Sequence, residues 1–460
     1  MITHPFVSGG GPKEEIWEIT VNTEATTSGA KITGIPINLY SQPGITMTVD
    51  WGDGTESVLT SASYSSDSDS APSVHEYATA GTYIVQMKST KWKNAYIDVL
   101  QNTNTDGLSH IAGFRSTLVG VGQLPRCKGV LYRSSSTSGL SRRIRSFSYC
   151  FHGCSALTSI PTGLFDNNPA VEDFSSCFRG CSHLASIPNG LFDNNTVVTN
   201  FNACFYGCSN IASIPTGLFD NNPAVTNFSF CFRNCSNITS IPAGLFDNNP
   251  EVTDFSFCFR SCSNITSIPA GLFDNNPEVT NFKCCFWDCS KIENIPAGLF
   301  HNNSKVTNFH MTFFSCNLSD IPIDIFTNCT AVTDMSGTFG GNNISSVPSG
   351  LFSSQTLVTT LGNNMNTANG IFAAGNSSRG VISIDENLFA HMLNLTEARF
   401  AFDGHYGFSI RFRATELTDV TAFCSKNTEY PVTVYVPAGS ATAEAFHAIA
   451  NANGIVVVEE

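Results

Sequence analysis

Apolar residues recur along the middle of the chain with a period of 27 residues. One stretch, CSNITSIPAGLFDNNPEVT, occurs twice without change, at 235–253 and at 262–280. The same offset relates the phenylalanines Phe147, Phe174, Phe201, Phe228, Phe255, Phe282 and Phe309, and the prolines Pro161, Pro188, Pro215, Pro242, Pro269 and Pro296. The pattern predicts a tandem array in which each unit buries its apolar side against its neighbours.

Each unit predicts a short strand followed by a short helix. The strand is expected at residues such as 238–241, which are β-prone and end in a turn at Pro and Gly. The helix is expected because Val171, Phe174, Cys177, Phe178 and Cys181 form one apolar stripe, with Asn168 as cap and Pro169 in the first turn. Stacking would give one solenoid over about 107–429, with a parallel sheet along one side.

The region before the array has a different pattern. Ile45, Met47, Val49 and Trp51 alternate with polar residues, Gly-Asp-Gly at 52–54 predicts a turn, and 81–87 alternates again. We therefore expect a small β domain at 14–100 after a tail at 1–13. Asp50 and Asp53 could bind a cation there, but a turn-forming role is the interpretation we prefer.

The two flanks of the array are predicted to close it. Residues 101–145 resemble a degenerate capping coil, with 118–125 in the strand position, and the array proper covers 146–429. Residues 430–460 predict a C-terminal cap with a strand at 432–436, a helix opened by Ser440 and closed by Asn453-Gly454, and a last strand at 455–458.

Two families share motifs with this chain. The pattern F-x-x-C-S-x-[LI]-T-S-I-P resembles BspA-type leucine-rich repeats and the related 26-residue repeats of bacterial surface proteins, although the period here is 27 and the Asp-Asn-Asn-Pro loop is different. VDWGDGT followed by HEYATAGTYIV is similar to PKD domains. The resemblance implies a leucine-rich-repeat-like solenoid preceded by a small all-β immunoglobulin-like sandwich. It also implies adhesion or recognition without catalysis or a cofactor.

Charge and hydropathy argue against two classes of binding partner, nucleic acid and the membrane interior. A net charge of −14 disfavours nucleic acid, and no stretch has the roughly 20 apolar residues that membrane insertion requires. The start, MITHPFVSGGGPKEE, lacks the basic and apolar regions of a signal peptide. The resemblance to surface-protein repeats implies an extracellular, cell-surface or virion-surface protein, and the N-terminus then requires either that a signal has been removed or that the protein is exported by another route.

Most of the cysteines fall in two columns on the apolar stripe. The first holds Cys150, Cys177, Cys204, Cys231, Cys258 and Cys285, and the second Cys154, Cys181, Cys208, Cys235, Cys262, Cys289 and Cys316. We expect these thiols to be buried and reduced. A ladder of disulfides between coils is the alternative, and a metal site is the reading we favour least, because the spacing lacks a C-x-x-C knuckle.

Catalytic motifs are not found: the chain has no P-loop, no G-x-S-x-G elbow and no H-E-x-x-H. Cys150 and His152 could suggest a nucleophile and a base. Helical spacing would point Cys150 inward and His152 outward, so the two side chains are not expected to meet. The column Asp166, Asp193, Asp220, Asp247 and Asp274 could suggest calcium, but loop-stabilising hydrogen bonds explain it more simply. We expect neither enzyme activity nor a bound metal.

The residues farthest from the apolar stripe give the candidate binding surface. They are Tyr149, His152, Arg179, Tyr206, Phe230, Arg233, Phe257, Arg260, Trp287 and Phe314. One interpretation is a solvent-exposed recognition line, where truncation weakens binding and leaves stability almost unchanged. The other is that the rings pack between coils.

Two functions remain open from the sequence. One is a recognition or adhesion protein for a protein or glycan on a cell surface. The alternative is a structural part of a virion, such as a phage tail or fibre, or of a surface layer, whose ridge contacts a neighbouring subunit.

Overall fold

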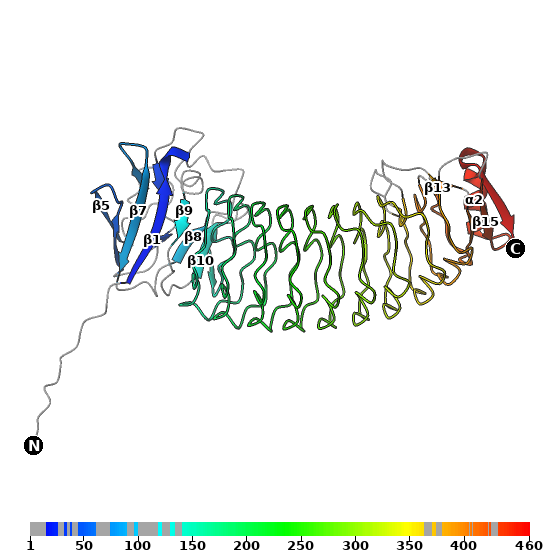
Figure 1. Ribbon diagram of the computed structural model, residues 1–460, viewed down its shortest axis with the longest axis horizontal. Helices are drawn as coiled ribbons and strands as arrows, with labels where there is room; N and C mark the ends of the chain where they lie inside the picture. The colour runs from blue at the N-terminus through cyan, green and yellow to red at the C-terminus, as the bar shows by residue number, and fades with distance from the viewer. Residues whose placement is uncertain are drawn as a thin grey trace, which may run out of the picture.

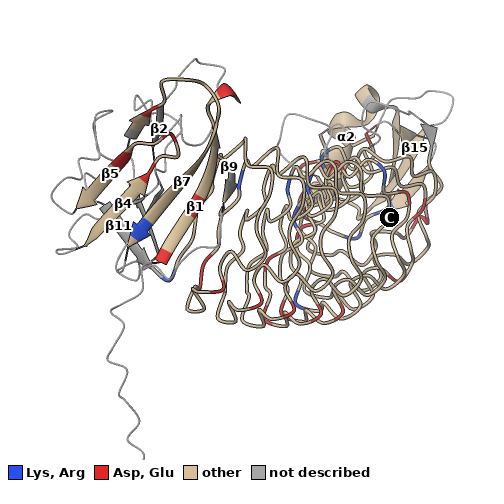
Figure 2. Cartoon of the chain, turned by 60° about the vertical axis from the view of Figure 1, so that its left-hand side comes forward, with Lys and Arg blue, Asp and Glu red and all other residues tan. Residues whose placement is uncertain are grey.

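The computed structural model describes residues 15–25, 32–34, 37–38, 45–60, 74–89, 96–99, 118–121, 129–133, 140–362, 370–373, 380–403, 405–406, 408–421, 423–424 and 431–460. The N-terminal strands lie at one end, a long stack of coils follows, and a helix with the last strands closes the other end (Figure 1). Figure 2 shows the N-terminal sheet beside the first coils from another side.

A five-stranded sheet forms the main N-terminal element, with the order β5-β4-β7-β1-β9 and antiparallel pairing throughout. Its strands are β1 (Glu15–Asn22), β4 (Thr46–Asp50), β5 (Glu56–Thr60), β7 (Thr82–Ser89) and β9 (Leu118–Val121). The alternating residues Ile45, Met47, Val49 and Trp51 are all buried. The strands predicted around these residues and at 81–87, and the hairpin between β4 and β5, are confirmed.

Smaller elements surround this sheet. They are η1 (Thr23–Ala25), β2 (Ile32–Gly34), β3 (Ile37–Asn38), β6 (Val74–Glu76), β8 (Tyr96–Val99), β10 (Gly129–Arg133) and β11 (Leu140–Ile144). β2 pairs with β6, and a second sheet has the order β11-β10-β8-β3. Among the described residues of 101–145, β10 and β11 form an antiparallel pair that the predicted degenerate coil does not include, while 118–121 takes the strand position as predicted. A hairpin satisfies the backbone groups of its own two strands, whereas a first coil has no preceding coil to pair with.

The turn between β4 and β5 depends on glycine. Gly52 and Gly54 have φ of 78° and 91°, in the region that glycine favours. A Cβ atom at Gly52 would lie 2.4 Å from the backbone oxygen of Ile84, while a Cβ at Gly54 would meet nothing within 4 Å.

Replacing these two glycines by alanine is expected to separate backbone strain from a steric clash. Gly54→Ala should lower the free energy of unfolding by about 1–2 kcal/mol, because only the left-handed conformation is penalised. Gly52→Ala should lower it by about 3 kcal/mol or more, because β7 must also move. Urea denaturation measures both values, and equal losses would contradict the close approach of Gly52 to β7.

Successive units of the array stack in parallel through one bridging residue each. These residues are Ser146, Asp173, Asn200, Asn227, Asp254, Asn281, Asn308, Asp334, Thr360, Glu397 and Asp419. The spacing is 27 residues as far as Asn308, 26 for the next two steps, and irregular beyond Thr360. The coils therefore continue past the part of the sequence where the repeat is regular.

The helix predicted in each unit is wrong. Between residues 146 and 362, all of which are described, the chain forms turns and single bridges, with no helix. The amides of Phe174, Ser176 and Phe178 donate to the next coil, at 2.8–3.0 Å, instead of to their own segment. Ser176 also has a φ of 55°, which a right-handed helix does not allow. The predicted burial of the apolar stripe is confirmed, because its members are all buried, but the stripe belongs to a series of turns and not to a helix.

The strand position of each unit forms no continuous sheet among these residues. Neighbouring coils share single bonds there, such as Ala185 N to Thr158 O at 3.2 Å and Thr239 N to Ala212 O at 3.4 Å. Thr158 donates in turn to the oxygen of Val119 in β9. β9 thus pairs with β1 and also occupies the strand position before the first coil, so it joins the N-terminal sheet to the stack.

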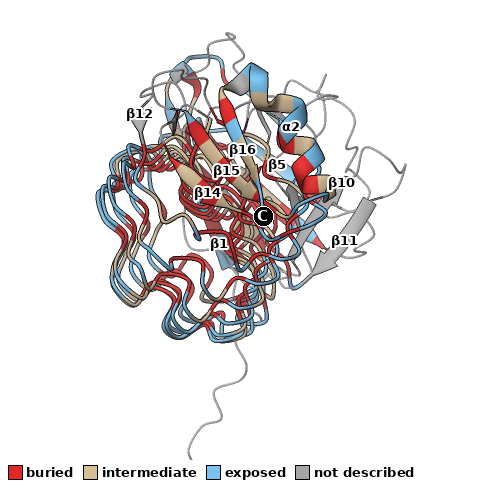
Figure 3. Cartoon of the chain, turned by 90° about the vertical axis from the view of Figure 1, so that its right-hand side faces the viewer, coloured by how far each residue is buried: buried red, intermediate tan, exposed pale blue. Residues whose placement is uncertain are grey.

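Phenylalanine columns fill the core of the stack. Phe174, Phe178 and Phe192 each stack on the equivalent ring one unit away, with centroids 5.5–6.3 Å apart. All three side chains are fully buried, and buried residues line the inside of the coils when the stack is viewed from its end (Figure 3). Because each ring contacts copies of itself, one repeated sequence packs equally well at every level.

A ladder of buried asparagines follows the core. Asn222 Nδ2 donates to the backbone oxygens of Phe192 (3.1 Å) and Asn195 (3.0 Å) in the preceding coil. The same two bonds recur at Asn195, Asn249, Asn276 and Asn303. The predicted role of Asn168 as a helix cap fails because no helix follows it. These amides join one coil to the next instead.

The C-terminal cap matches its prediction element by element. β15 (Val432–Val436) and β16 (Ile455–Glu459) pair in parallel, with α2 (Ala441–Asn453) between them in sequence. Ser440 accepts a hydrogen bond from Ala443 N, and Gly454 ends the helix with a φ of 64°. β14 (Ser409–Arg411) extends this sheet, and β12 (Gly380–Val381) pairs with β13 (His405–Tyr406).

Candidate functional site

The candidate binding residues from the sequence meet in one line along the stack. The guanidinium of Arg179, one unit earlier, lies 4.6 Å from the ring centroid of Tyr206. The guanidinium of Arg233, one unit later, lies 5.1 Å from the same centroid. Arg233 and Arg260 lie 5.6 and 5.7 Å from Phe257, and Arg260 lies 3.5 Å from Trp287. We call Arg179, Tyr206, Phe230, Arg233, Phe257, Arg260 and Trp287 the Arg–aromatic ladder.

Aromatic contacts occur within the ladder, at its C-terminal end and separately at the first coil. Phe230 stacks on Phe257 with centroids 4.4 Å apart, and Phe314 meets Trp287 edge to face at 5.7 Å. At the first coil, Tyr149 and His152 make a similar edge contact at 5.5 Å. Contacts thus join eight of the ten candidate residues, from Arg179 to Phe314, while Tyr149 and His152 contact each other at the first coil. The sequence did not predict that cations and rings would alternate by stacking.

The backbone beneath the ladder is left-handed at two positions in every coil. The first column has a φ between 53° and 61° and holds Tyr149, Ser176, Ala203, Phe230, Phe257, Cys284 and Met311. The second lies four residues later and holds Gly153, Gly180, Gly207, Asn234, Ser261, Asp288 and Ser315. This conformation is costly for residues other than glycine, and more so for bulky ones. Strain of this kind that is kept in successive units marks a candidate functional surface.

The ladder is half-buried, which corrects the expectation of a fully exposed line. Arg233, Phe257, Arg260 and Trp287 all have intermediate exposure. Stacking between neighbouring coils covers part of each side chain and leaves the rest open to solvent. Both interpretations of the sequence thus hold in part: the rings pack between coils, and they still offer a surface.

The ladder carries three guanidinium groups, and the nearest compensation for them is the attraction of Asp288 for Arg260. Among the described residues, none of Arg179, Arg233 and Arg260 forms an ion pair. Burial and then repulsion from Arg233 lower the pKa of Arg260. Asp288 attracts Arg260, but its own pKa is raised by burial. The Nε atoms of Arg233 and Arg260 are buried without a hydrogen-bond partner.

The two cysteine columns are buried, as predicted. Every cysteine that the structure describes, which leaves out only Cys127, is a buried free thiol. In the second column the thiols from Cys181 to Cys316 donate to a carbonyl of the preceding coil, for example Cys208 to Phe178 O at 3.1 Å. Burial raises the pKa of these thiols, to about 12 for Cys262. Within the described parts of the chain, no group of three or more His, Cys, Asp or Glu could hold a metal ion.

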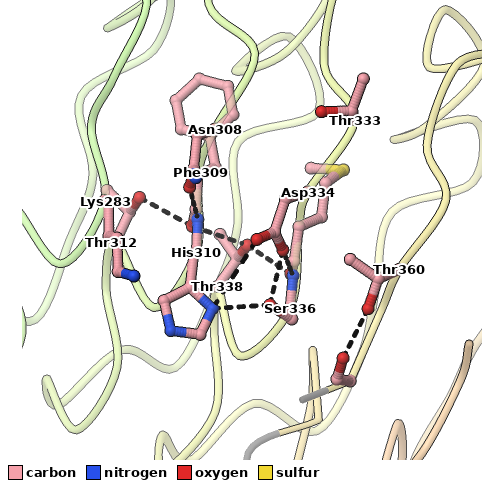
Figure 4. A network of polar contacts seen from close by, with 12 residues as sticks. Lys283, Asn308, Phe309, His310, Thr312, Thr333, Asp334, Ser336, Thr338 and Thr360 are labelled. Atoms are coloured by element: carbon pink, nitrogen blue, oxygen red, sulfur yellow. Dashed lines mark hydrogen bonds and ion pairs between the residues drawn. The ribbon is translucent and has the colours of Figure 1, made fainter. Parts of the chain in front are cut away.

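A buried polar network lies where the period changes from 27 to 26. His310, Ser336 and Asp334 point toward one another (Figure 4). Ser336 donates to Asp334 at 2.5 Å, so the 2.6 Å contact between His310 Nδ1 and Ser336 Oγ requires the proton on Nδ1. Burial lowers the pKa of His310, which favours the neutral ring. His310 and Ser336 are nearly inaccessible and the hydroxyl faces the acid, so the trio presents no nucleophile to solvent.

The aspartates considered for a cation act in turns. Asp50 accepts a hydrogen bond from Gly52 N. Asp53 accepts from the amide and hydroxyl of Thr55 and contacts His75 at 2.7 Å. Burial alone would raise the pKa of Asp53, but these hydrogen bonds lower it.

The aspartate column of the array also shapes a turn. Asp220 N donates to Gly217 O at 3.1 Å, and its carboxylate covers the space where a Cβ of Gly217 would lie. Acidic segments recur along one edge of the stack (Figure 2). The column is therefore explained by local backbone geometry.

Comparison with known proteins adds no assignment. No helix within the described ranges is long and apolar enough to span a membrane. Neither the protein-family models nor the curated proteins searched give a match to this chain.

Proposed function

We propose that this protein is a non-catalytic recognition or adhesion protein, which binds a macromolecule on a cell surface along the Arg–aromatic ladder. In this proposal the stack is a leucine-rich-repeat-like solenoid, and the N-terminal sheets are an immunoglobulin-like domain that carries it. The observation behind the proposal is the ladder itself. It is a continuous row of half-exposed rings and unpaired guanidinium groups over strained backbone.

Physical chemistry favours this surface over the others. Arg, Tyr and Trp are the residues that most often dominate binding energy, and their planar groups lose little conformational entropy on binding. The strand-position face carries small polar residues such as Ser213, Ser240 and Ser267, which are exposed and uncharged. A ligand would gain little from them in comparison with the ladder.

Removing the ladder's strongest contact is expected to weaken adhesion. Arg260→Ala and Trp287→Ala, tested singly, should each cost about 2 kcal/mol of binding to cells. Fluorescently labelled full-length protein on a panel of bacterial and animal cells measures this, with Ser267→Ala as the matched control on the other face.

Stability is expected to respond as well. Because Arg260 and Trp287 stack on each other, each variant should lose about 1 kcal/mol of unfolding free energy, more than an exposed site would. If the wild-type protein adheres to none of the cells and instead self-associates through the ladder, the adhesion proposal fails and a subunit role replaces it.

A further inference from the structure

We infer that the Arg–aromatic ladder takes a linear acidic glycan, whose chain lies along the axis of the coil stack. This inference rests on the proposed function, which it narrows from any surface macromolecule to one class. Three observations lead to it: the charge of the ladder, its alternation, and the state of the backbone beneath it.

The charge calls for an anion. Arg179, Arg233 and Arg260 stand in coils one or two units apart, and none of them has an ion-pair partner among the described residues. The chain as a whole carries 37 acidic and 23 basic residues. The ladder is therefore a line of positive charge on an acidic protein, and an anionic ligand would be held there and repelled elsewhere.

The alternation calls for a ligand with both flat apolar faces and charged groups. The guanidinium groups lie over the rings of Tyr206, Phe257 and Trp287, so a ligand would meet the parts of these half-buried rings that stacking leaves open. A guanidinium binds a carboxylate or a sulfate ester through two parallel donors, while an aromatic ring packs on apolar surface such as one face of a sugar. A polymer of acidic sugars repeats both features along one direction, as the ladder does.

The backbone disfavours a peptide strand. Peptides often bind by adding a strand to free amide and carbonyl groups at an edge. Here Gly180 N donates to Tyr206 O at 2.7 Å, and Gly207 N and Ser261 N donate to Arg233 O and Trp287 O in the same way. These groups already join one coil to the next, so the side chains must supply the contacts.

The sparse charge disfavours nucleic acid. Binding to DNA or RNA depends on neutralising many closely spaced phosphates with a broad basic surface. The ladder holds three arginines over a row of seven residues. Three separate guanidinium groups are better matched by a ligand whose acidic groups are also few and separate.

Titration of the full-length protein with defined polymers tests the ligand class. The probes are polygalacturonate, dextran sulfate, and neutral dextran as the uncharged match for dextran sulfate. Wild-type protein should bind at least one acidic polymer and should not bind dextran. Affinity should fall about tenfold or more between about 0.05 M and 0.5 M salt, because the guanidinium groups are partly open to screening.

Paired variants locate the binding. Arg233→Gln with Arg260→Gln should reduce affinity about tenfold or more. Lys291→Gln with Lys305→Gln removes the same charge from exposed positions outside the ladder and should leave affinity unchanged. Arg233→Lys with Arg260→Lys keeps the charge but loses the planar fork and should bind more weakly than wild type. Thermal melting checks that every variant is folded.

The outcomes separate this inference from the proposal it rests on. If both acidic polymers fail to bind, or if the glutamine and control variants bind equally, the glycan inference is overturned. Cell adhesion that still depends on Trp287 would then leave the recognition proposal standing with another ligand. If the wild-type protein adheres to no cells and binds neither acidic polymer, both the recognition proposal and the glycan inference fail.

Discussion

Raising the pH from about 7 to about 10 is expected to unfold the coil stack cooperatively. Burial holds the pKa of thiols such as Cys177, Cys204 and Cys262 above its ordinary value. The unfolded chain has ordinary thiols, with a pKa of about 8.5. Their contribution to stability is therefore complete below that pH, and is lost as the pH rises from there toward the folded values, which reach about 12 for Cys262.

The size of this effect comes from the number of thiols that change together. Each buried thiol removes about 1.4 kcal/mol of unfolding free energy per pH unit above the unfolded pKa. Burial raises the pKa of eleven thiols in the two columns, and a domain has only about 5–15 kcal/mol of stability in total. Urea denaturation, in the presence of a reducing agent, should therefore show a steep loss of stability above pH of about 9.

Single variants separate the ionisation of a thiol from the packing that is lost when its side chain is shortened. Cys208→Ala costs some stability at every pH, but it should also make the alkaline slope shallower by about 1.4 kcal/mol per pH unit. Ser209→Ala, in the same turn, should leave the slope unchanged. A stability that stays constant up to pH of about 10 would mean that the thiols ionise freely in the folded protein or are oxidised.

Changing Asn249 to Asp is expected to destabilise the stack by about 3–5 kcal/mol at neutral pH. Asn249 Nδ2 donates to the oxygens of Phe219 (3.0 Å) and Asn222 (2.9 Å), and its side chain is fully buried. An aspartate would place a buried negative charge against two carbonyl oxygens that have lost their donor.

The neighbouring residue supplies a matched control. Asn248 is exposed, so Asn248→Asp makes the same chemical change and should alter stability by about 0.5 kcal/mol or less. Burial should raise the pKa of this aspartate, so the part of the penalty caused by its charge should be absent below the unfolded value of about 3.9 and grow as the pH rises, whereas the part caused by the lost amide donor remains at every pH. Chemical denaturation at pH of about 4 and 7 measures the difference. Equal effects of the two substitutions would show that the hydrogen bonds of the asparagine ladder do not stabilise the stacking of coils.

Local signals in the sequence determined the elements that depend on local chemistry. Ser440 and Gly454 mark the ends of α2 because capping uses groups within a few residues. Alternation from Ile45 to Trp51 identified β4, since side chains on successive residues of a strand point to opposite faces. The 27-residue period likewise identified which phenylalanines and cysteines are buried, because every unit must present the same apolar side.

Tertiary structure decided where the backbone hydrogen bonds go. The spacing of Phe174, Cys177, Phe178 and Cys181 fits a helix and a series of turns equally well, because both bring residues three or four apart onto one side. The structure distinguishes the two, because the amide of Phe178 donates to the backbone oxygen of Cys204 in the next coil, which a helix would not allow. Asn222 occupies the same repeat position as Asn168, which was predicted to cap a helix, but its acceptors, Phe192 O and Asn195 O, are 30 and 27 residues away.

The ladder shows the same division. Its members could be found in the sequence, since they are the positions farthest from the apolar stripe. Their pairing could not, because Arg260 meets Trp287 only when one coil lies on the next at a left-handed residue such as Phe257. Contacts between units depend on the offset and rotation of stacking, which no single unit encodes. The sequence thus determined what each coil buries, and the stacking of coils decided which side chains meet at the surface.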